Sequence, residues 1–149
     1  MSEMRPSRGV VVGVDGSPAA DRALAFALEE AKLRRLPLTV ISASEVPALE
    51  YAGSALIASA DLDSEAEHHA DSVLGRAAAQ LGSEPGVEVD LISVHGHPAT
   101  VLLEYSEDAE IVVVGTRGHG SLAGALLGSV SQAVAHKCAK PVVVVSAPR

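Results

Sequence analysis

Aromatic side chains are scarce in this 149-residue chain, which has one phenylalanine, two tyrosines and no tryptophan. Hydrophobic residues nevertheless make up 48% of it, so the core must be built from valine, leucine, isoleucine and alanine. With so few aromatic rings the chain offers little on which unpaired nucleic-acid bases stack. The composition therefore predicts a globular protein with an aliphatic core.

Basic residues are also few, since 11 lysines and arginines stand against 19 aspartates and glutamates, for a net charge of −8. Binding to nucleic acid or to an anionic membrane needs basic side chains that displace counterions. We therefore expect neither as a partner. A bound anion would have to be held locally, by backbone N–H groups and a helix dipole rather than by a broad basic patch.

Cys138 is the only cysteine, which excludes an intramolecular disulfide. No apolar run approaches the roughly 20 residues that span a bilayer, and the first residues do not resemble a secretory signal. These features predict a cytoplasmic protein. The length fits a single domain over residues 1–149.

Short β-branched runs alternate with helical patterns along the chain. The expected strands are 9–15, 38–43, 87–94, 111–114 and 141–146, and the expected helices are 18–35, 61–81, 98–106 and 129–138. Segment 44–60 has no periodicity and is expected to be a loop or a short irregular helix. This alternation predicts the α/β class, with a parallel sheet covered by helices on both faces. Asp15 and Gly115 can share a crevice only if the first and fourth strands are neighbours, which favours the order 3-2-1-4-5.

The stretch 111–130 combines a buried-strand pattern with a glycine-rich loop and the expected start of a helix. The glycines permit positive φ and a close approach of the backbone to a ligand. Ser129 suits a helix N-terminus, where its hydroxyl could cap the first turn and the exposed N–H groups favour a phosphate. The alternative is that the glycines simply make the turn. The stretch is not a P-loop, because no Gly-Lys-Ser/Thr occurs, and it lacks the third glycine of the dinucleotide fingerprint.

The spacing of Gly115, Gly118 and Gly128-Ser129, with two and then nine residues between the glycines, resembles the ATP-binding signature of the universal stress protein family. The resemblance extends over nearly the whole chain. It implies a five-stranded Rossmann-like sheet in the order given above and an ATP site. We expect a divalent cation, Mg²⁺ or Mn²⁺, to be held through the phosphates and water.

Residues around the strand ends complete the expected nucleotide site. Asp15 either accepts hydrogen bonds from the ribose or adenine, as the family places its nucleotide-contacting aspartate here, or starts the Asp-Gly-Ser-Pro turn. By resemblance, Ala43 lines the adenine pocket through its backbone, and Val114 and Val130 flank it, although by pattern alone both valines are ordinary core residues. The expected binding residues are Val14, Asp15, Ala43, Val114, Gly115, Arg117, Gly118, Gly128, Ser129 and Val130.

Other polar residues leave alternatives open. Arg117 is the cation best placed to contact a phosphate, but it could equally be a solvent-exposed arginine of the loop. The same two alternatives hold for His119. His95 and His97 would lie on one face of a strand as a conceivable metal pair, without a third ligand. Cys138 at a helix end is interpreted as packing rather than as a reactive thiol. No Ser-His-Asp or Cys-His set can be assembled, so the sequence predicts no catalytic residue and no protein metal ligand.

The sequence thus favours an ATP-binding regulatory module over a metabolic enzyme. The alternatives are a slow ATPase or nucleotidyl transferase, a binder of AMP or cyclic AMP, and an interaction protein with an empty pocket. The fifth strand, 141–146, carries four consecutive valines at the expected sheet edge, which predicts a homodimer through this strand. Dimers through this edge are also what the family resemblance implies. The alternative is that the valines face helices on both sides.

Overall fold

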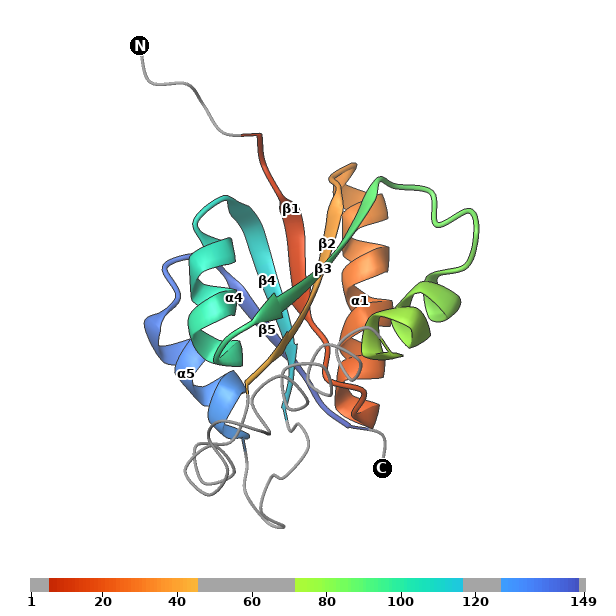
Figure 1. Ribbon diagram of the computed structural model, residues 1–149. Coiled ribbons are helices and arrows are strands. Elements are labelled where there is room, and N and C mark those ends of the chain that lie inside the picture. Colours follow the sequence, from red (N-terminus) through yellow and green to blue (C-terminus); the bar gives the residue numbers. More distant parts are fainter. Residues whose placement is uncertain (1–5, 46–71, 117–126, 148–149) are drawn as a thin grey trace.

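The computed structural model describes residues 6–45, 72–116 and 127–147, which form one five-stranded sheet flanked by helices (Figure 1). The strands are β1 (Gly9–Gly13), β2 (Leu38–Ser44), β3 (Val89–His95), β4 (Ala109–Gly115) and β5 (Val142–Val145). They are parallel and lie in the order β3-β2-β1-β4-β5. The α/β class and the strand order expected from the sequence are confirmed.

Helices cover both faces of the sheet. Helix α1 (Pro18–Arg34) and a helix over residues 72–81 cover one face, and α4 (Pro98–Ser106) and α5 (Ser129–Lys137) cover the other (Figure 1). Successive residues of β1 pack on opposite faces of the sheet. Val10 and Val12 belong to the hydrophobic core on the α1 side, and Val11 belongs to the core on the α4 side. All three valines are fully buried, as expected of a central parallel strand.

Local signals in the sequence account for the ends of α1. The Ser17 hydroxyl accepts a hydrogen bond from the Ala20 N–H at 3.2 Å, and Pro18 is the first helical residue. The helix ends at Arg34, because Arg35 adopts the left-handed conformation with φ of 57°. Gly82 likewise ends the helix over residues 72–81, with φ of 79°. Both the Ser17 cap and the Gly82 stop confirm the sequence interpretation.

Several expected boundaries move or lie outside the described residues. The third strand begins at Val89 and the fourth at Ala109, and the fifth is limited to Val142–Val145. Most of the segment 44–60 and the first part of the helix expected over 61–81 fall outside the described residues. In the part of the chain that is described, no helix has the length and apolar character needed to cross a bilayer.

Candidate nucleotide site

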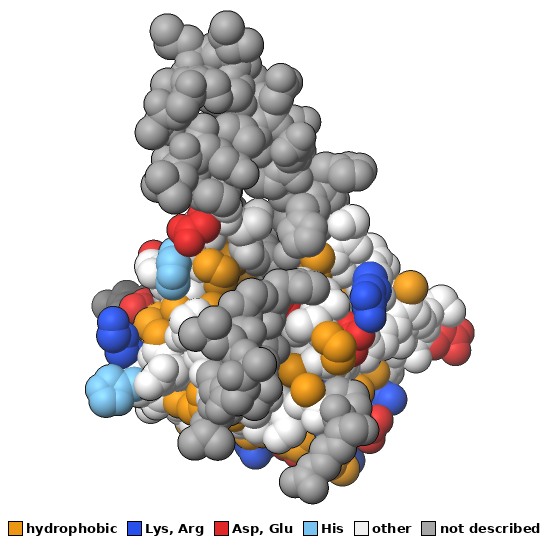
Figure 2. Space-filling view, turned by 90° about the horizontal axis from the view of Figure 1, so that it is seen from below, with side chains coloured by type: hydrophobic (Ala, Val, Ile, Leu, Met, Phe, Trp, Pro, Cys, Tyr) orange, Lys and Arg blue, Asp and Glu red, His pale blue; other side chains and the backbone are white. Residues whose placement is uncertain are grey.

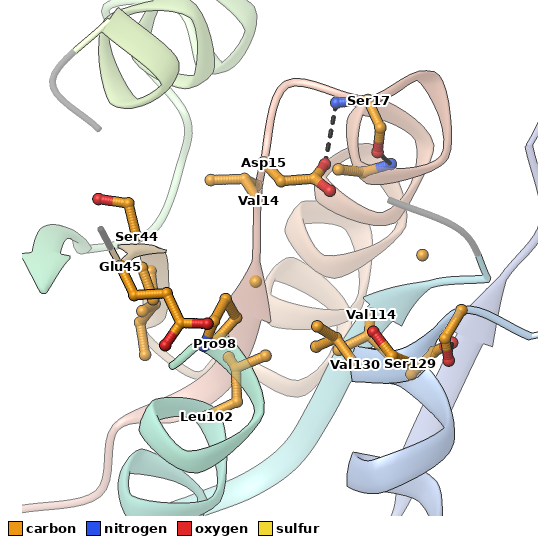
Figure 3. Close-up of a pocket in the computed structure, with 17 residues that line it drawn as sticks. Val14, Asp15, Ser17, Ser44, Glu45, Pro98, Leu102, Val114, Ser129 and Val130 are labelled. Carbon is orange, nitrogen blue, oxygen red and sulfur yellow. Dashed lines mark hydrogen bonds between the residues drawn. The ribbon is translucent and has the colours of Figure 1, made fainter. Parts of the chain in front are cut away.

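A cavity of about 300 Å³ opens at the carboxyl ends of β1, β2 and β4 (Figure 3). In the sheet β1 lies between β2 and β4. The chain runs from β1 outward to β2 and β3 and then crosses over to β4 on the other side of β1, so the cavity lies at the switch point at which open α/β sheets bind ligands. Its volume is at the lower end of the range of small-molecule sites. The lining residues are Gly13, Val14, Asp15, Ser17, Ala20, Ile41, Ala43, Ser44, Glu45, Pro98, Leu102, Val114, Gly115, Gly128, Ser129, Val130 and Ser131.

Every expected binding residue that the structure describes lines this cavity. These residues are Val14, Asp15, Ala43, Val114, Gly115, Gly128, Ser129 and Val130. Arg117 and Gly118 lie outside the described residues. The fold thus brings together residues from four separate segments of the chain, and their role in binding stays a prediction.

The turn between β1 and α1 shows what Asp15 does in the fold. Its carboxylate Oδ1 accepts a hydrogen bond from the Ser17 N–H at 2.9 Å, and Gly16 has φ of 83°. The alternative role of Asp15, starting the Asp-Gly-Ser-Pro turn, is therefore present in the structure. A role toward a ligand is compatible with it, because a carboxylate has about four acceptor sites and Asp15 is only half-buried at the cavity wall.

Helix α5 points its N-terminus at the cavity, but not with the cap expected from the sequence. Gly128 is the N-cap residue, with φ of −74°, and no side chain of the described residues caps the helix. Ser129 is already the first helical residue, so the expectation that its hydroxyl caps the first turn is wrong. The N–H groups of the first turn, with the positive end of the helix dipole, therefore lie at the cavity wall, in contrast to α1, which Ser17 caps.

The expected positive φ is not the reason for a glycine at position 115. Gly128 and Gly115 do not have positive φ; in the described ranges the glycines that do are Gly9, Gly16, Gly82 and Gly86. A Cβ on Gly115 would instead lie 2.8 Å from the Ala19 Cβ and 2.9 Å from the Ala19 carbonyl carbon. Gly115 is therefore needed because the end of β4 touches the first turn of α1, not because of its φ.

The charged side chains of the described lining are both acidic, Asp15 and Glu45. Glu45 lies across the cavity from Ser129 and Val130 (Figure 3). On the described surface at this end of the molecule, lysines and arginines are scattered rather than gathered (Figure 2). No lysine or arginine is among the described lining residues, so a phosphate bound there would depend on the partial positive charge of the α5 N-terminus.

Sequence reasoning missed several lining residues. Ser44 is the last residue of β2 and Glu45 follows it, and Pro98 and Leu102 come from one face of α4. The spacing of four residues between Pro98 and Leu102 is a helical-face signal, but only the packing of α4 shows that this face meets the cavity. Ser131, one turn into α5, was also missed.

The histidine pair and the cysteine have other settings. His95 ends β3 and His97 is the N-cap of α4, so the two do not share a strand face as expected. Over residues 6–45, 72–116 and 127–147, no group of three or more His, Cys, Asp or Glu side chains is arranged to hold a metal. Cys138 follows α5 and packs against the core on the α4 side, in agreement with a packing role.

Known proteins that resemble this chain are universal stress proteins. A model of the universal stress protein family matches residues 7–146. Universal stress protein Rv2005c of Mycobacterium tuberculosis (strain ATCC 25618 / H37Rv) is 40% identical over 136 residues, which are 91% of this chain and 44% of that protein. The chain therefore spans less than half the length of this curated relative.

Two solved structures share the fold and hold adenine nucleotides. A universal stress protein in complex with cAMP is 25% identical, has a TM-score of 0.68, and covers 97% of this chain and 100% of its own. The universal stress protein from Archaeoglobus fulgidus in complex with dAMP is 27% identical, has a TM-score of 0.67, and covers 95% of this chain and 99% of its own. With its glycine spacing, its strand order and the family match over residues 7–146, this chain belongs to the universal stress protein family.

Proposed function

We propose that the protein binds ATP in this cavity and acts as a regulatory module. The observation that carries the proposal is the N-terminus of α5, which no side chain among the described residues caps and which opens onto a cavity at the switch point of the sheet. The adenine nucleotides bound by two structural neighbours support it. The single cysteine of the chain is in keeping with the cytoplasm as its compartment.

The wall opposite α5 suits the nucleoside. Ile41, Ala43, Pro98 and Leu102 give it an apolar surface of the kind that takes a flat base. Asp15 stands at the end of β1, between this wall and α5, where its carboxylate would accept hydrogen bonds from ribose hydroxyls (Figure 3). The base would then lie over β2, and the phosphates would extend toward α5.

The wall formed by α5 suits the phosphates, whose charge would be met by the helix N-terminus and by Arg117, with Gly118 allowing close approach. The described lining has no metal-binding cluster, and its two carboxylates repel phosphate. A Mg²⁺ or Mn²⁺ ion bound to the phosphates and to water fits this lining, because Mg²⁺ commonly keeps several waters and needs few protein ligands. When bound, the ion would neutralise phosphate charge.

We favour a regulatory role over a metabolic one, because no Ser-His-Asp or Cys-His set can be assembled from the sequence. Slow ATP hydrolysis in the same cavity is the competing activity. Phosphate release measured at saturating ATP separates the two. A steady rate well above that of a heat-denatured sample would favour the enzyme.

The identity of the nucleotide is tested by mass spectrometry of ligand released from the purified protein, followed by calorimetric competition between ATP, AMP and cyclic AMP. We expect ATP to bind most tightly in the presence of Mg²⁺. The neighbours that hold cAMP and dAMP make a monophosphate the second candidate. Tighter binding of AMP or cyclic AMP would replace ATP in the proposal, and no binding of any adenine nucleotide would refute it.

We also propose a homodimer through β5, which lies at the edge of the sheet. Its valines pack on the two helical layers, Val143 and Val145 on the α1 side and Val142 and Val144 on the other. The carbonyls of Pro141 and Val145 accept hydrogen bonds from the N–H groups of Val112 and Thr116, on the β4 side. Because successive residues of a strand point their backbone groups to opposite sides, the N–H and C=O groups of Val142 and Val144 point away from β4. A second copy related by a two-fold axis would pair with these groups.

Val144→Pro tests this edge, because it removes an outward N–H while leaving the β4 ladder intact. We expect light scattering to show a dimer for the wild type at micromolar concentration and a folded monomer for the variant. Replacing Val143 and Val145 with lysine is a poorer test, since both side chains pack against the core and the double variant would unfold. A monomeric wild type, or a Val144→Pro variant that stays dimeric, would refute the dimer.

A further inference from the structure

The backbone of Thr116, directly after the end of β4, is hydrogen-bonded to both β5 and the start of α5. Its N–H donates to the Val145 carbonyl of β5 at 2.8 Å. Its carbonyl accepts a hydrogen bond from the Gly128 N–H at the start of α5. Residues 116 and 128, which flank the glycine loop, are therefore held together directly.

Ser131 adds a second connection at the same carbonyl. Its hydroxyl lies 2.9 Å from the Thr116 carbonyl oxygen and 3.1 Å from the Gly128 carbonyl oxygen. Both are acceptors, so the hydroxyl must donate to them, and its proton is committed to the backbone. The residue is only 2% exposed although it lines the cavity.

The two bonds fix how the first turn of α5 sits relative to the end of β4. Without the Ser131 hydroxyl, one hydrogen bond between Gly128 and Thr116 would hold the start of the helix to that strand. Backbone N–H groups stabilise a phosphate well only when they are already oriented toward it. Small rotations of a helix end therefore matter more to the phosphates than to a base bound on the opposite wall.

We propose that Ser131 is a positioning residue that orients the N-terminus of α5 for the phosphates, an inference that rests on the proposed binding of ATP. The hydroxyl acts through the Thr116 and Gly128 carbonyls and does not itself contact the ligand. A lost hydrogen bond of this kind corresponds to an affinity change of about tenfold.

The test compares Ser131→Ala with Ser106→Ala. Ser106 is a matched control because it is buried in α4, its hydroxyl donates to the Leu103 carbonyl three residues earlier, and it does not line the cavity. We expect Ser131→Ala to weaken Mg-ATP about tenfold and to leave adenosine unchanged, whereas Ser106→Ala changes neither. Ser131→Thr keeps a hydroxyl that can donate to the Gly128 carbonyl three residues earlier, so this variant should bind Mg-ATP as the wild type does.

Amide hydrogen exchange of the ligand-free protein measures how firmly the Gly128 N–H is held at the Thr116 carbonyl. The Gly128 N–H should exchange faster in Ser131→Ala, by up to about tenfold, and at the wild-type rate in Ser106→Ala. Equal losses of ATP and adenosine affinity, or wild-type binding and exchange in Ser131→Ala, would overturn the inference. Titrating the wild type first separates the two failures. A wild type that binds no adenine nucleotide refutes the proposed function and, with it, the role of Ser131 toward phosphates. A wild type that binds ATP while Ser131→Ala binds it equally well refutes the role of Ser131 alone, and the exchange rates decide in either case whether Ser131 holds Gly128.

Discussion

Gly115→Ala should destabilise the protein through one contact between β4 and α1. The added Cβ would lie 2.8 Å from the Ala19 Cβ, 2.9 Å from the Ala19 carbonyl carbon and 3.0 Å from the Ala20 nitrogen. Two of these atoms belong to the backbone of a helix whose first turn is fixed by the Ser17 cap, so they cannot move aside cheaply. Overpacking of this kind costs roughly 1–3 kcal/mol in the free energy of unfolding.

Two other glycines supply matched controls for the same chemical change. A Cβ on Gly13 would lie 2.8 Å from a terminal methyl group of Leu102, a flexible side chain that can adjust, so Gly13→Ala should cost less than Gly115→Ala. Gly75 lies in the helix over residues 72–81, and no atom of the described residues lies within 4 Å of its added Cβ. Gly75→Ala should therefore stabilise the protein by about 0.5–1 kcal/mol, since alanine is the better helix former.

Urea denaturation and thermal melting of the three variants measure these effects. For a chain of this size each kcal/mol corresponds to a shift in Tm of about 2–4 °C. The expected order of stability is Gly75→Ala above wild type, with Gly13→Ala and then Gly115→Ala below. If Gly115→Ala is as stable as Gly75→Ala, the contact between the end of β4 and the first turn of α1 does not constrain the fold, and the reasoning is refuted.

Two predictions concern the ligand. Gly128→Asp should stabilise α5 by a few tenths of a kcal/mol, because aspartate is a good N-cap residue and the φ of −74° suits it. The same variant should weaken ATP binding in calorimetry, because its carboxylate lies beside the phosphates, and should leave adenosine affinity unchanged. Unimpaired ATP binding would contradict the proposed position of the phosphates. Asp15→Ala should lower the affinity for ATP and adenosine alike, whereas Arg117→Ala should lower the affinity for ATP far more than that for adenosine. Both ligands are titrated against both variants. The opposite pattern would mean that the nucleoside and phosphate ends of the site are exchanged.

The sequence by itself determined the elements of this protein and their order. Four consecutive β-branched residues, Ile111–Val114, indicate a buried strand, and Ser17-Pro18 indicates a helix start, because each signal acts within a few residues of the chain. The alternation of strands and helices then leaves a parallel sheet as the arrangement that buries all the apolar runs. The placement of Asp15 and Gly115 at strand ends, on the premise that the two share one crevice, favours the first and fourth strands as neighbours, and the family resemblance implies the same order.

Only the tertiary structure decided why particular residues occupy the cavity wall. Gly115 meets Ala19, which lies 96 residues earlier in the chain, and no local pattern reports such a contact. The sequence favours Ser129 as the cap of the last helix, but in the structure Gly128 is the N-cap residue, and its N–H donates to the Thr116 carbonyl. Ser131 reads as an ordinary helical serine until α5 packs beside β4 and its hydroxyl reaches Thr116. These roles depend on distances between separate elements, which are set by the packing of the whole sheet and its helices rather than by neighbours along the chain.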